Sequence, residues 1–370
     1  MNRLPRLLAI GTAVPDGEFS QESAARHASA VAQHADGHVP SGRSDAVLGV
    51  LYRRAGVHTR STVLPDSGHD LTSYFPPALK GGPSTAQRME TYRAHAGTLA
   101  QRAATRAFER TSVAPGDITH VVTASCTGFD APGVDQHLMR SLGIPLTARR
   151  TNVGFMGCHA AINALAAANA FAREDPRNRV LIVCVEICSL HFSYDADNEK
   201  RVANALFADG AAAAIIGADE TADAGETPTI AGFASTLLPD SSELMTWRIG
   251  DHGFEMSLSP RVPGVLADHV PAWLDGVLET HGLSRDAVAS WAIHPGGPRL
   301  LSAITNALNL SKDADFASRV ILAEQGNMSS ATVLFIVERM LRDRPTNAPA
   351  CPLVAAAFGP GLAGEAMLLR

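Results

Sequence analysis

The chain has 370 residues, which is too long for one ordinary hydrophobic core and predicts two domains or two fused halves. Hydrophobic residues make up 46% of the chain and charged residues 18%, a balance that excludes a disordered protein. The formal net charge is −6 and no dense block of Lys or Arg occurs, so the composition does not indicate nucleic-acid binding. It is compatible with binding of an anionic small molecule at a local cationic patch.

The first 20 residues predict a buried strand rather than a targeting segment. The apolar run LLAIGTAVP is shorter than the core of a signal peptide, and no stretch approaches the ~18 apolar residues of a membrane span. Five cysteines, an odd number scattered along a large chain, argue against a disulfide framework and for a reducing cytoplasm. They are Cys126, Cys158, Cys184, Cys188 and Cys351.

Residues 20–112 contain a group of histidines near the amino terminus, a proline-rich stretch and a long helical pattern. His27, His34 and His38 lack the context of a metal site and are predicted to lie on the surface. Residues 60–84 carry four prolines and little periodicity, which predicts a long surface or active-site loop. Residues 85–111 predict a helix.

Short β-branched runs then alternate with alanine-rich stretches, which predicts an α/β protein with a largely parallel or mixed sheet. Strands that are apolar on both faces are expected at 118–126, 179–188 and 211–219, and a helix at 158–175. Cys184 and Cys188 would lie ~13 Å apart along their strand, so we predict no metal site there.

One shift in composition divides the chain. Residues 219–229 (DETADAGETPT) are acidic and rich in turn-forming residues, and they predict a linker between an N-terminal half, 1–218, and a C-terminal half, 230–370. The second half repeats the order of strand and helix: IAGFAST, a helix at 263–281, SWAIHP, another helix and CPLVAAAFGPGL.

Cys158 lies in the stretch GFMGCHAA, where a strand should give way to a helix. Gly154 and Gly157 permit a tight turn, and Cys158 is predicted in the first helical turn. There the helix dipole and free backbone N–H groups would lower the pKa of the thiol. Free cysteines are often simply buried, so the local pattern alone fits a structural thiol as well.

Two further polar residues lie at similar junctions. His294 ends the apolar run WAIHP before the turn Pro295–Pro298, and Asn327 precedes an apolar helix in EQGNMSSATVLF. Each alone fits a structural histidine or a helix cap. Cysteine, histidine and asparagine at matching junctions, however, suit a nucleophile, a base and an oxyanion donor.

The chain resembles type III polyketide synthases of the chalcone synthase-like group, within the thiolase-like superfamily, over nearly its whole length. The resemblance is carried by the motifs GFMGCHAA, AIHPGGP, GNMSSA, FGPGL, ALFADGAAA, CTGFDAPG and RVPG. It implies a thiolase-like αβαβα fold with two similar halves in each subunit, and a homodimer.

The resemblance also implies a mechanism. Cys158 would accept a starter acyl group from an acyl-CoA, while His294 would hold it as thiolate. His294 and Asn327 would bind the thioester carbonyl of malonyl-CoA and stabilise the enolate that forms as carbon dioxide leaves. Neither a metal nor a cofactor is expected, because CoA thioesters are the substrates and two donors delocalise the charge. Iterative condensation and cyclisation to a pyrone or resorcinol-type product would follow.

Residues of the reaction cavity follow from the same resemblance. Phe207 corresponds to a gatekeeping phenylalanine, and Met256 takes the place of a second aromatic gatekeeper. Trp247 falls where plant chalcone synthases have glycine, so it should remove volume, and a flavonoid-type starter is less expected than an aliphatic one. The other cavity or substrate-binding positions are Cys126, Thr127, Cys188, His191, Gly297 and Ser329.

CoA should be recognised by cations at the tunnel mouth. Arg54, in LYRRAG, matches one CoA-binding lysine of the family, and Arg53 is its neighbour. Two other basic positions of the family fall on Val47 and Val50, so the cationic patch is thinner or displaced. Solvated helix charges are an equally good explanation of Arg53.

Two alternatives remain open. The same three residues would serve an enzyme similar to ketoacyl synthase III, which makes one condensation on an acyl carrier protein. A catalytically inactive thiolase-like partner subunit is less favoured, since such subunits usually lose the nucleophile, and Cys158 is present here. Starter length, number of extensions and mode of cyclisation do not follow from the sequence.

Overall fold

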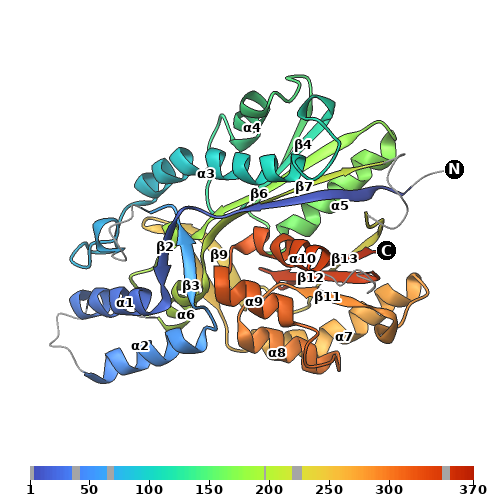
Figure 1. The fold of residues 1–370 in the computed structure, drawn as a ribbon. Helices are drawn as coiled ribbons and strands as arrows, with labels where there is room; N and C mark the ends of the chain where they lie inside the picture. The colour runs from blue at the N-terminus through green and yellow to red at the C-terminus, as the bar shows by residue number, and fades with distance from the viewer. Residues whose placement is uncertain (1–3, 36–41, 65–70, 196, 219–226, 344–350) are drawn as a thin grey trace.

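The computed structural model describes residues 4–35, 42–64, 71–195, 197–218, 227–343 and 351–370. Two β-sheets lie one above the other with helices between and outside them (Figure 1). The order of layers is helix, sheet, helix, sheet, helix, which confirms the predicted αβαβα architecture.

The first sheet has the strand order β1-β7-β6-β4-β5. Strand β4 runs parallel to β5 and β6, whereas β7 is antiparallel to both β6 and β1, so the sheet is mixed as predicted. Its strands are β1 (Arg6–Ala13), β4 (His120–Ser125), β5 (Arg149–Gly154), β6 (Arg179–Ile187) and β7 (Asp209–Gly217).

Helices cover both faces of this sheet, and that explains its uniformly apolar strands. Every residue of β4 and β7 is buried, and so is all of β6 after Arg179. The outer layer consists of α3 (Thr85–Phe108) and α4 (Val134–Leu142), and the middle layer of α5 (Ala160–Glu174) and α10 (Thr332–Arg342). Alanines on α5 let this helix approach the sheet closely within one continuous core.

The second sheet has the order β11-β12-β13-β8 and lies on the other side of the middle helices. Its strands are β8 (Ile230–Leu237), β11 (Ser290–Ile293), β12 (Leu353–Gly359) and β13 (Ala363–Leu369). Its outer helices are α7 (Val262–Thr280) and α8 (Pro298–Ala307), and α9 (Phe316–Gln325) leads back to α10. Leucine and valine side chains of α7 and α8 form its separate outer core.

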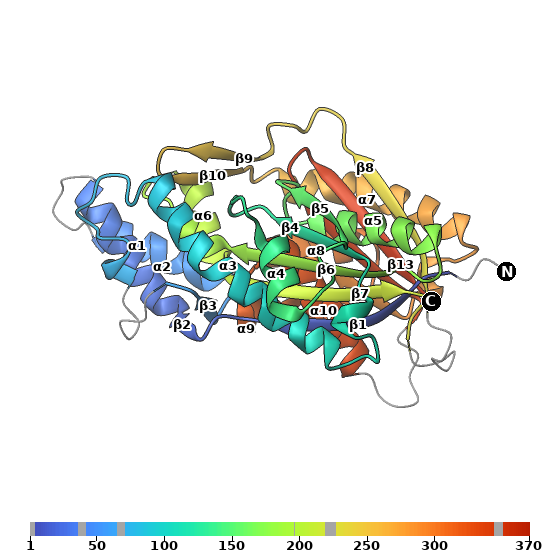
Figure 2. The ribbon, with the colours of Figure 1, turned by 90° about the horizontal axis from the view of Figure 1, so that it is seen from above.

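Two smaller units complete the molecule at one end. The first contains α1 (Gln21–Ala35), α2 (Gly42–Arg54), the antiparallel pair β2 (Gly17–Ser20) and β3 (Thr59–Thr62), and α6 (Asn198–Leu206). The second is the hairpin of β9 (Met245–Gly250) and β10 (Gly253–Leu258), which lies beside α6 (Figure 2). Both contribute walls to the cavity described below.

The structure corrects three sequence predictions. Residues 60–84 are not one long loop, because residues 59–62 form β3 and pair with β2. His27 is buried and not on the surface, since it packs against Phe75 and Phe192. The helix expected from residue 158 begins at Ala160. His38 and residues 219–226 of the expected linker lie outside the described residues.

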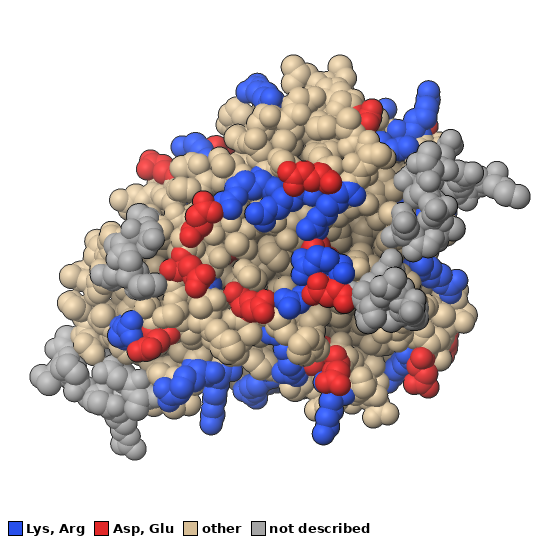
Figure 3. Space-filling model, viewed as in Figure 1, with Lys and Arg blue, Asp and Glu red and all other residues tan. Residues whose placement is uncertain are grey.

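Charged side chains of both signs are intermixed on the face seen in Figure 3. Ion pairs join charged side chains of the protein, among them Arg102 with Asp16 and Arg110 with Glu338. No helix among the described residues is long and apolar enough to cross a membrane.

Candidate active site

Cys158 lies on a tight turn that follows β5. Phe155 and Gly157 both have positive φ, at 61° and 83°, so the chain reverses sharply before the cysteine. A Cβ atom on Gly157 would lie 2.4 Å from Cδ of Pro360, so only glycine lets the turn approach the FGPGL segment this closely. The turn thus brings the nucleophile candidate against a loop of the other half of the chain.

The thiol does not have the environment that the sequence predicted. His159 is the N-cap residue of α5, so Cys158 precedes the helix instead of lying in its first turn. The residue is only 8% exposed, and burial raises the pKa of the thiol to about 12, although the side chains of Ser329 and Asn327 oppose this as hydrogen-bond partners. Burial therefore favours the protonated thiol in the free protein.

Asn327 is held from both sides by the segment after α6. Its N–H donates to the Leu206 carbonyl at 2.9 Å, and its own carbonyl accepts from the Ala208 N–H at 2.9 Å. The side-chain Oδ1 accepts from the Ser329 N–H at 2.9 Å, which fixes the amide plane. These bonds place Asn327 and Ser329 at the thiol. They also join Asn327 to Phe207, which lies between Leu206 and Ala208 in the chain.

His294 follows β11, and its N–H donates to the Ala356 carbonyl of β12 at 2.8 Å. The ring is fully buried, and neither Nδ1 nor Nε2 has a hydrogen-bond partner in the described part of the chain. Burial and, to a smaller extent, the neighbouring His159 lower the pKa of His294 to about 3. A neutral imidazole with no fixed bond can accept or donate a proton, so His294 suits a base or a polarising donor.

His159 itself is buried behind the thiol. Its Nδ1 pairs with Oδ1 of Asn163 at 2.7 Å, one turn along α5. A Cβ on Gly359 would lie 2.6 Å from the His159 ring, so the imidazole packs directly against the backbone of β12. His159 therefore links α5 to the second sheet close to Cys158.

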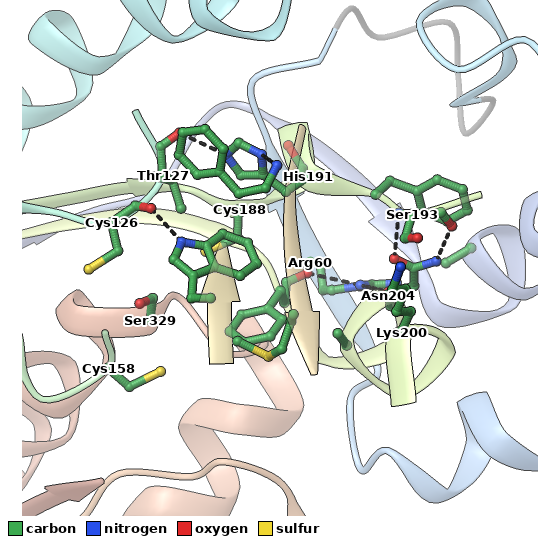
Figure 4. Close-up of a pocket in the computed structure, with 18 of the residues that line it drawn as sticks. Arg60, Cys126, Thr127, Cys158, Cys188, His191, Ser193, Lys200, Asn204 and Ser329 are labelled. Carbon is green, nitrogen blue, oxygen red and sulfur yellow. Dashed lines mark hydrogen bonds between the residues drawn. The ribbon is translucent and has the colours of Figure 1, made fainter. Parts of the chain in front are cut away.

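A cavity opens in front of the thiol, and the space between its lining atoms is about 930 Å³, open solvent at its mouth included. Of the residues predicted for the site, those that line it are Cys158, Phe207, Met256, Trp247, Cys126, Thr127, Cys188, His191 and Ser329. Cys126, Cys158 and Ser329 gather at one end of the view in Figure 4, and Arg60, Ser193 and Asn204 at the other. Mostly apolar side chains lie between the two ends.

Five predicted site residues lie apart from this lining or behind it. His294 and Asn327 are not among the lining residues, although Asn327 contacts the thiol. Gly297 is the N-cap residue of α8 and lies against Leu206. Arg53 and Arg54 are exposed in the last turn of α2, so the structure does not bring them to the cavity wall.

An aromatic wall closes one side of the cavity. The Trp247 indole donates to the Cys126 carbonyl at 2.7 Å and meets His191 and Phe254 edge to face. His191 donates from Nε2 to the Thr127 carbonyl at 2.7 Å, while its Nδ1 accepts from the Phe254 N–H at 2.9 Å. Both ring nitrogens are used, so this tautomer is neutral and fixed, and burial lowers the pKa of His191 to about 3.

The sequence analysis missed a buried carboxyl group behind this wall. Glu186 accepts from the Cys126 N–H at 3.0 Å, from Oγ1 of Thr127 at 2.8 Å and from Oγ of Ser330. Burial raises its pKa to about 6 against the effect of these bonds. The sequence feature that indicates it is the single acidic residue in the apolar run RVLIVCVEIC. Burying a carboxyl group in a strand that is covered on both faces is costly, so such a residue indicates a structural or functional role.

Comparisons with known proteins show the family of the chain. The family of chalcone and stilbene synthases matches with its N-terminal domain over residues 3–220 and with its C-terminal domain over residues 230–370. The alpha-pyrone synthesis polyketide synthase-like protein of Mycobacterium tuberculosis is 32% identical over 323 residues, 86% of this chain and 80% of that protein. The 1,3,6,8-tetrahydroxynaphthalene synthase of Streptomyces peucetius is 32% identical over 372 residues, 100% of this chain and 94% of that protein.

A solved structure is similar throughout. The crystal structure of PKS-I from the brown alga Ectocarpus siliculosus superposes with a TM-score of 0.91 at 28% identity, covering 100% of this chain and 99% of the other. The similarity therefore extends to both sheets and to the smaller units.

Proposed function

Since the chain belongs to the chalcone and stilbene synthase family, we propose that Cys158, His294 and Asn327 carry out its reaction. The protein is a type III polyketide synthase, an acyltransferase whose decarboxylating Claisen condensations extend an acyl group before cyclisation. The observation that carries the assignment is the meeting of a buried thiol, Asn327 and Ser329 at the head of an apolar cavity.

The first step loads the starter. His294, whose buried imidazole has no hydrogen-bond partner among the described residues, takes the proton of the Cys158 thiol as the acyl-CoA thioester arrives. The sulfur bonds to the acyl carbon, the bond from that carbon to the CoA sulfur breaks, and the proton passes from His294 to the departing CoA. Burial raises the pKa of the thiol and so favours its protonated form in the free protein, and we infer that His294 acts as a general base when the substrate arrives.

The second step generates the nucleophile. Malonyl-CoA places its thioester oxygen towards the Asn327 amide and His294, the carbon–carboxylate bond breaks, and carbon dioxide leaves. The electron pair moves onto an enolate whose oxygen accepts hydrogen bonds from these two donors. The fixed amide plane of Asn327 means that its donor needs no reorganisation as charge develops.

Condensation then joins the two units. The enolate carbon bonds to the acyl carbon on Cys158, the bond from that carbon to the sulfur breaks, and a β-ketoacyl-CoA two carbons longer is released. Reloading and repetition give a poly-β-keto chain that cyclises to a pyrone or resorcinol-type product. Trp247, Met256 and Phe207 limit the chain because they narrow the cavity in front of the thiol.

No bound cofactor is needed, since the CoA thioesters supply both the carbon atoms and the leaving group. The starter is an aliphatic acyl group. Trp247 supports an aliphatic starter, because its anchored indole fills space that a bulky aromatic starter would need. We keep Arg54, and with it Arg53, as CoA-binding residues. Both are exposed cations in one helical turn, which is compatible with phosphate contacts outside the cavity.

We also propose two halves and a homodimer. The division into 1–218 and 230–370, with residues 219–229 as the linker, is supported by the sheets, since each draws its strands from one half. An exposed apolar patch supports the dimer: Phe129 is 43% and Met156 40% exposed, and the Phe155 ring lies 5.5 Å from Phe129. This patch flanks the turn of Cys158.

Incubation of the purified protein with a short aliphatic acyl-CoA and malonyl-CoA tests the function. We expect carbon dioxide release and products of at least two extensions, detected by mass spectrometry, without any carrier protein. A requirement for acyl carrier protein, or a product of one extension only, would favour the ketoacyl synthase III-like alternative. Product formation by Cys158→Ala would refute the assignment of the nucleophile.

A further inference from the structure

The end of the cavity remote from Cys158 has a chemistry that the proposed mechanism does not use. Residues of β2, α1, α2 and β3 line it together with the segment around η1 (Leu71–Ser73). Most of them are apolar: Phe19, Ala24, Leu64, Leu71, Phe75 and Phe192. Two buried polar side chains, Tyr52 and Arg60, interrupt this apolar lining.

Both polar side chains carry an atom without a partner. Tyr52 is 1% exposed and Arg60 is 3% exposed, and among the described residues neither the Tyr52 hydroxyl nor the Arg60 Nε–H has a hydrogen-bond partner. Leaving a buried donor unsatisfied is unfavourable, so two such atoms on one cavity wall indicate that something else bonds them. Water or a ligand group is able to do so.

The positive charge of Arg60 is also without a carboxylate partner within the described residues. Its Nη1 donates to the carbonyls of Asn204 at 2.7 Å and Phe207 at 2.9 Å, and its guanidinium lies over the Phe19 ring at 4.7 Å. The nearby Asp209 is already engaged, accepting from Val63 and Ser189. A buried cation bonded only to neutral groups favours an anion at its free donor.

The electrostatics of Tyr52 agree with this. Burial raises the pKa of its hydroxyl to about 12, while the charges of Arg60 and Arg201 oppose the rise. The hydroxyl is therefore a hydrogen-bond donor at neutral pH, with two cations near it. Burial lowers the pKa of Arg60 to about 10, so the guanidinium stays charged under the same conditions.

We propose that the Tyr52 hydroxyl and the Arg60 Nε–H form a carboxylate-binding subsite, and that the starter is the mono-CoA thioester of an aliphatic dicarboxylic acid. The inference rests on the proposed function and narrows its starter. With the acyl carbon on Cys158, the acyl chain passes the apolar side chains of the lining and presents its far carboxylate to these two donors of the same cavity.

Besides the phosphates of CoA, which are proposed to contact Arg54 outside the cavity, the carboxylate of the malonyl extender is an anion that enters this enzyme, and it fits the subsite less well. Decarboxylation needs that group beside Asn327 and His294, where the enolate forms. A charge-assisted bond to Arg60 would stabilise the carboxylate in the ground state and slow its loss. The subsite therefore suits a carboxylate that survives the reaction.

Matched pairs of starters test the proposal: succinyl-CoA with butyryl-CoA, glutaryl-CoA with pentanoyl-CoA, and adipyl-CoA with hexanoyl-CoA. The rate of Cys158 acylation is followed by intact-protein mass spectrometry without malonyl-CoA, and kcat/KM for product is measured with it. We expect the wild-type enzyme to prefer the carboxylated member of at least one pair by tenfold or more.

Tyr52→Phe is the informative variant, because it removes only a hydroxyl that has no hydrogen-bond partner among the described residues. We expect it to lower the preference for the carboxylated starter over the alkyl starter about tenfold. Arg60→Met should abolish the preference if the variant folds, as judged by circular dichroism. Tyr194→Phe is the control, since that hydroxyl donates to the Pro76 carbonyl and does not line the cavity.

Three results would overturn the proposal. An equal rate for both members of every pair would mean that the donors hold a buried water only. A preference for carboxylated starters that survives Tyr52→Phe would place their recognition elsewhere, and a preference for the alkyl starters would refute an anion site. If no acyl-CoA of either kind acylates Cys158, the proposed function fails instead.

Discussion

Burial of Cys158, and not its distance from a helix, sets the state of the nucleophile. The helix dipole acts on groups in the first turn, whereas Cys158 precedes the N-cap residue of α5. Desolvation therefore dominates, and the pKa of the thiol lies at about 12. This favours the protonated thiol in the free enzyme until a substrate arrives.

This state predicts slow alkylation of Cys158 by iodoacetamide near pH 7, slower than that of a free thiol of pKa ~8.5. Because the pKa is raised, the thiolate fraction should keep increasing about tenfold per pH unit across pH 7–9. Peptide mapping after timed alkylation measures the rate at Cys158 alone. If the alkylation rate has already reached its plateau at pH 7, Cys158 is a thiolate in the free enzyme and this prediction is wrong.

Residue types were predictable from the sequence at this scale, and their environments were not. The motifs around Cys158 and Asn327 identify residues that meet in the structure. The direction of the thiol pKa shift depends on how deeply the turn is buried under Pro360, a contact between segments some 200 residues apart in the chain. No local pattern carries that information.

Asn327 is the donor whose loss should separate the two half-reactions. Asn327→Ala should slow carbon dioxide release from malonyl-CoA by about 10²–10³-fold, because one of two enolate donors is gone. Acylation of Cys158 by the starter should change much less. Stopped assays of carbon dioxide and intact-protein mass spectrometry measure the two steps, and an equal loss in both would indicate a merely structural asparagine.

The hairpin β9–β10 and the short helix η3 (Cys188–His191) act together as a wall because His191 joins them. His191 lies in η3, donates to the Thr127 carbonyl and accepts from Phe254 of β10. Trp247 of β9 is anchored at the same wall. The shape of the reaction cavity thus depends on one neutral imidazole.

This imidazole predicts a pH-dependent stability. The folded-state pKa of His191, about 3, lies below the unfolded value of ~6.5. Its contribution is complete above pH 6.5 and is lost as the pH falls towards 3, by up to about 1.4 kcal/mol per pH unit. His294 adds a similar loss, because burial likewise lowers its pKa to about 3.

Urea unfolding at several pH values between 7 and 5 isolates the effect. The free energy of unfolding of wild type should fall more steeply with decreasing pH than that of His191→Gln, which cannot take up a proton. The comparison uses the difference in slope, so a general destabilisation of the variant does not disturb it. Parallel curves would mean that His191 titrates normally in the folded protein.

At the scale of elements the buried strands were predictable and the short β3 was not. Apolar runs such as 179–188 predict a covered strand because every residue is buried. The sequence TRST has no such pattern, and it becomes a strand only because it pairs with β2, some 40 residues earlier. The prolines around it suggested a loop, and so Arg60 on β3 escaped notice.

The whole molecule exposes an apolar patch of Phe129, Phe155 and Met156, and the proposed homodimer would bury it. Light scattering coupled to size exclusion should show a dimer for wild type and a shift towards monomer for Phe129→Asp, because a carboxylate in a dry interface is costly. Leu146→Asp is the matched control: Leu146 is 77% exposed at another place. A monomeric wild type, or equal effects of both variants, would contradict this interface.

The chain has three tryptophans, and only Trp247 belongs to the reaction cavity. Its indole is fixed by a bond to the Cys126 carbonyl, in a wall that Cys158 shares. Trp273 and Trp291 belong to the outer core of the second half, so their replacement by phenylalanine would leave one fluorophore. Changes in its emission would then report the arrival of each acyl group in real time, so the enzyme carries its own optical gauge of cavity occupancy.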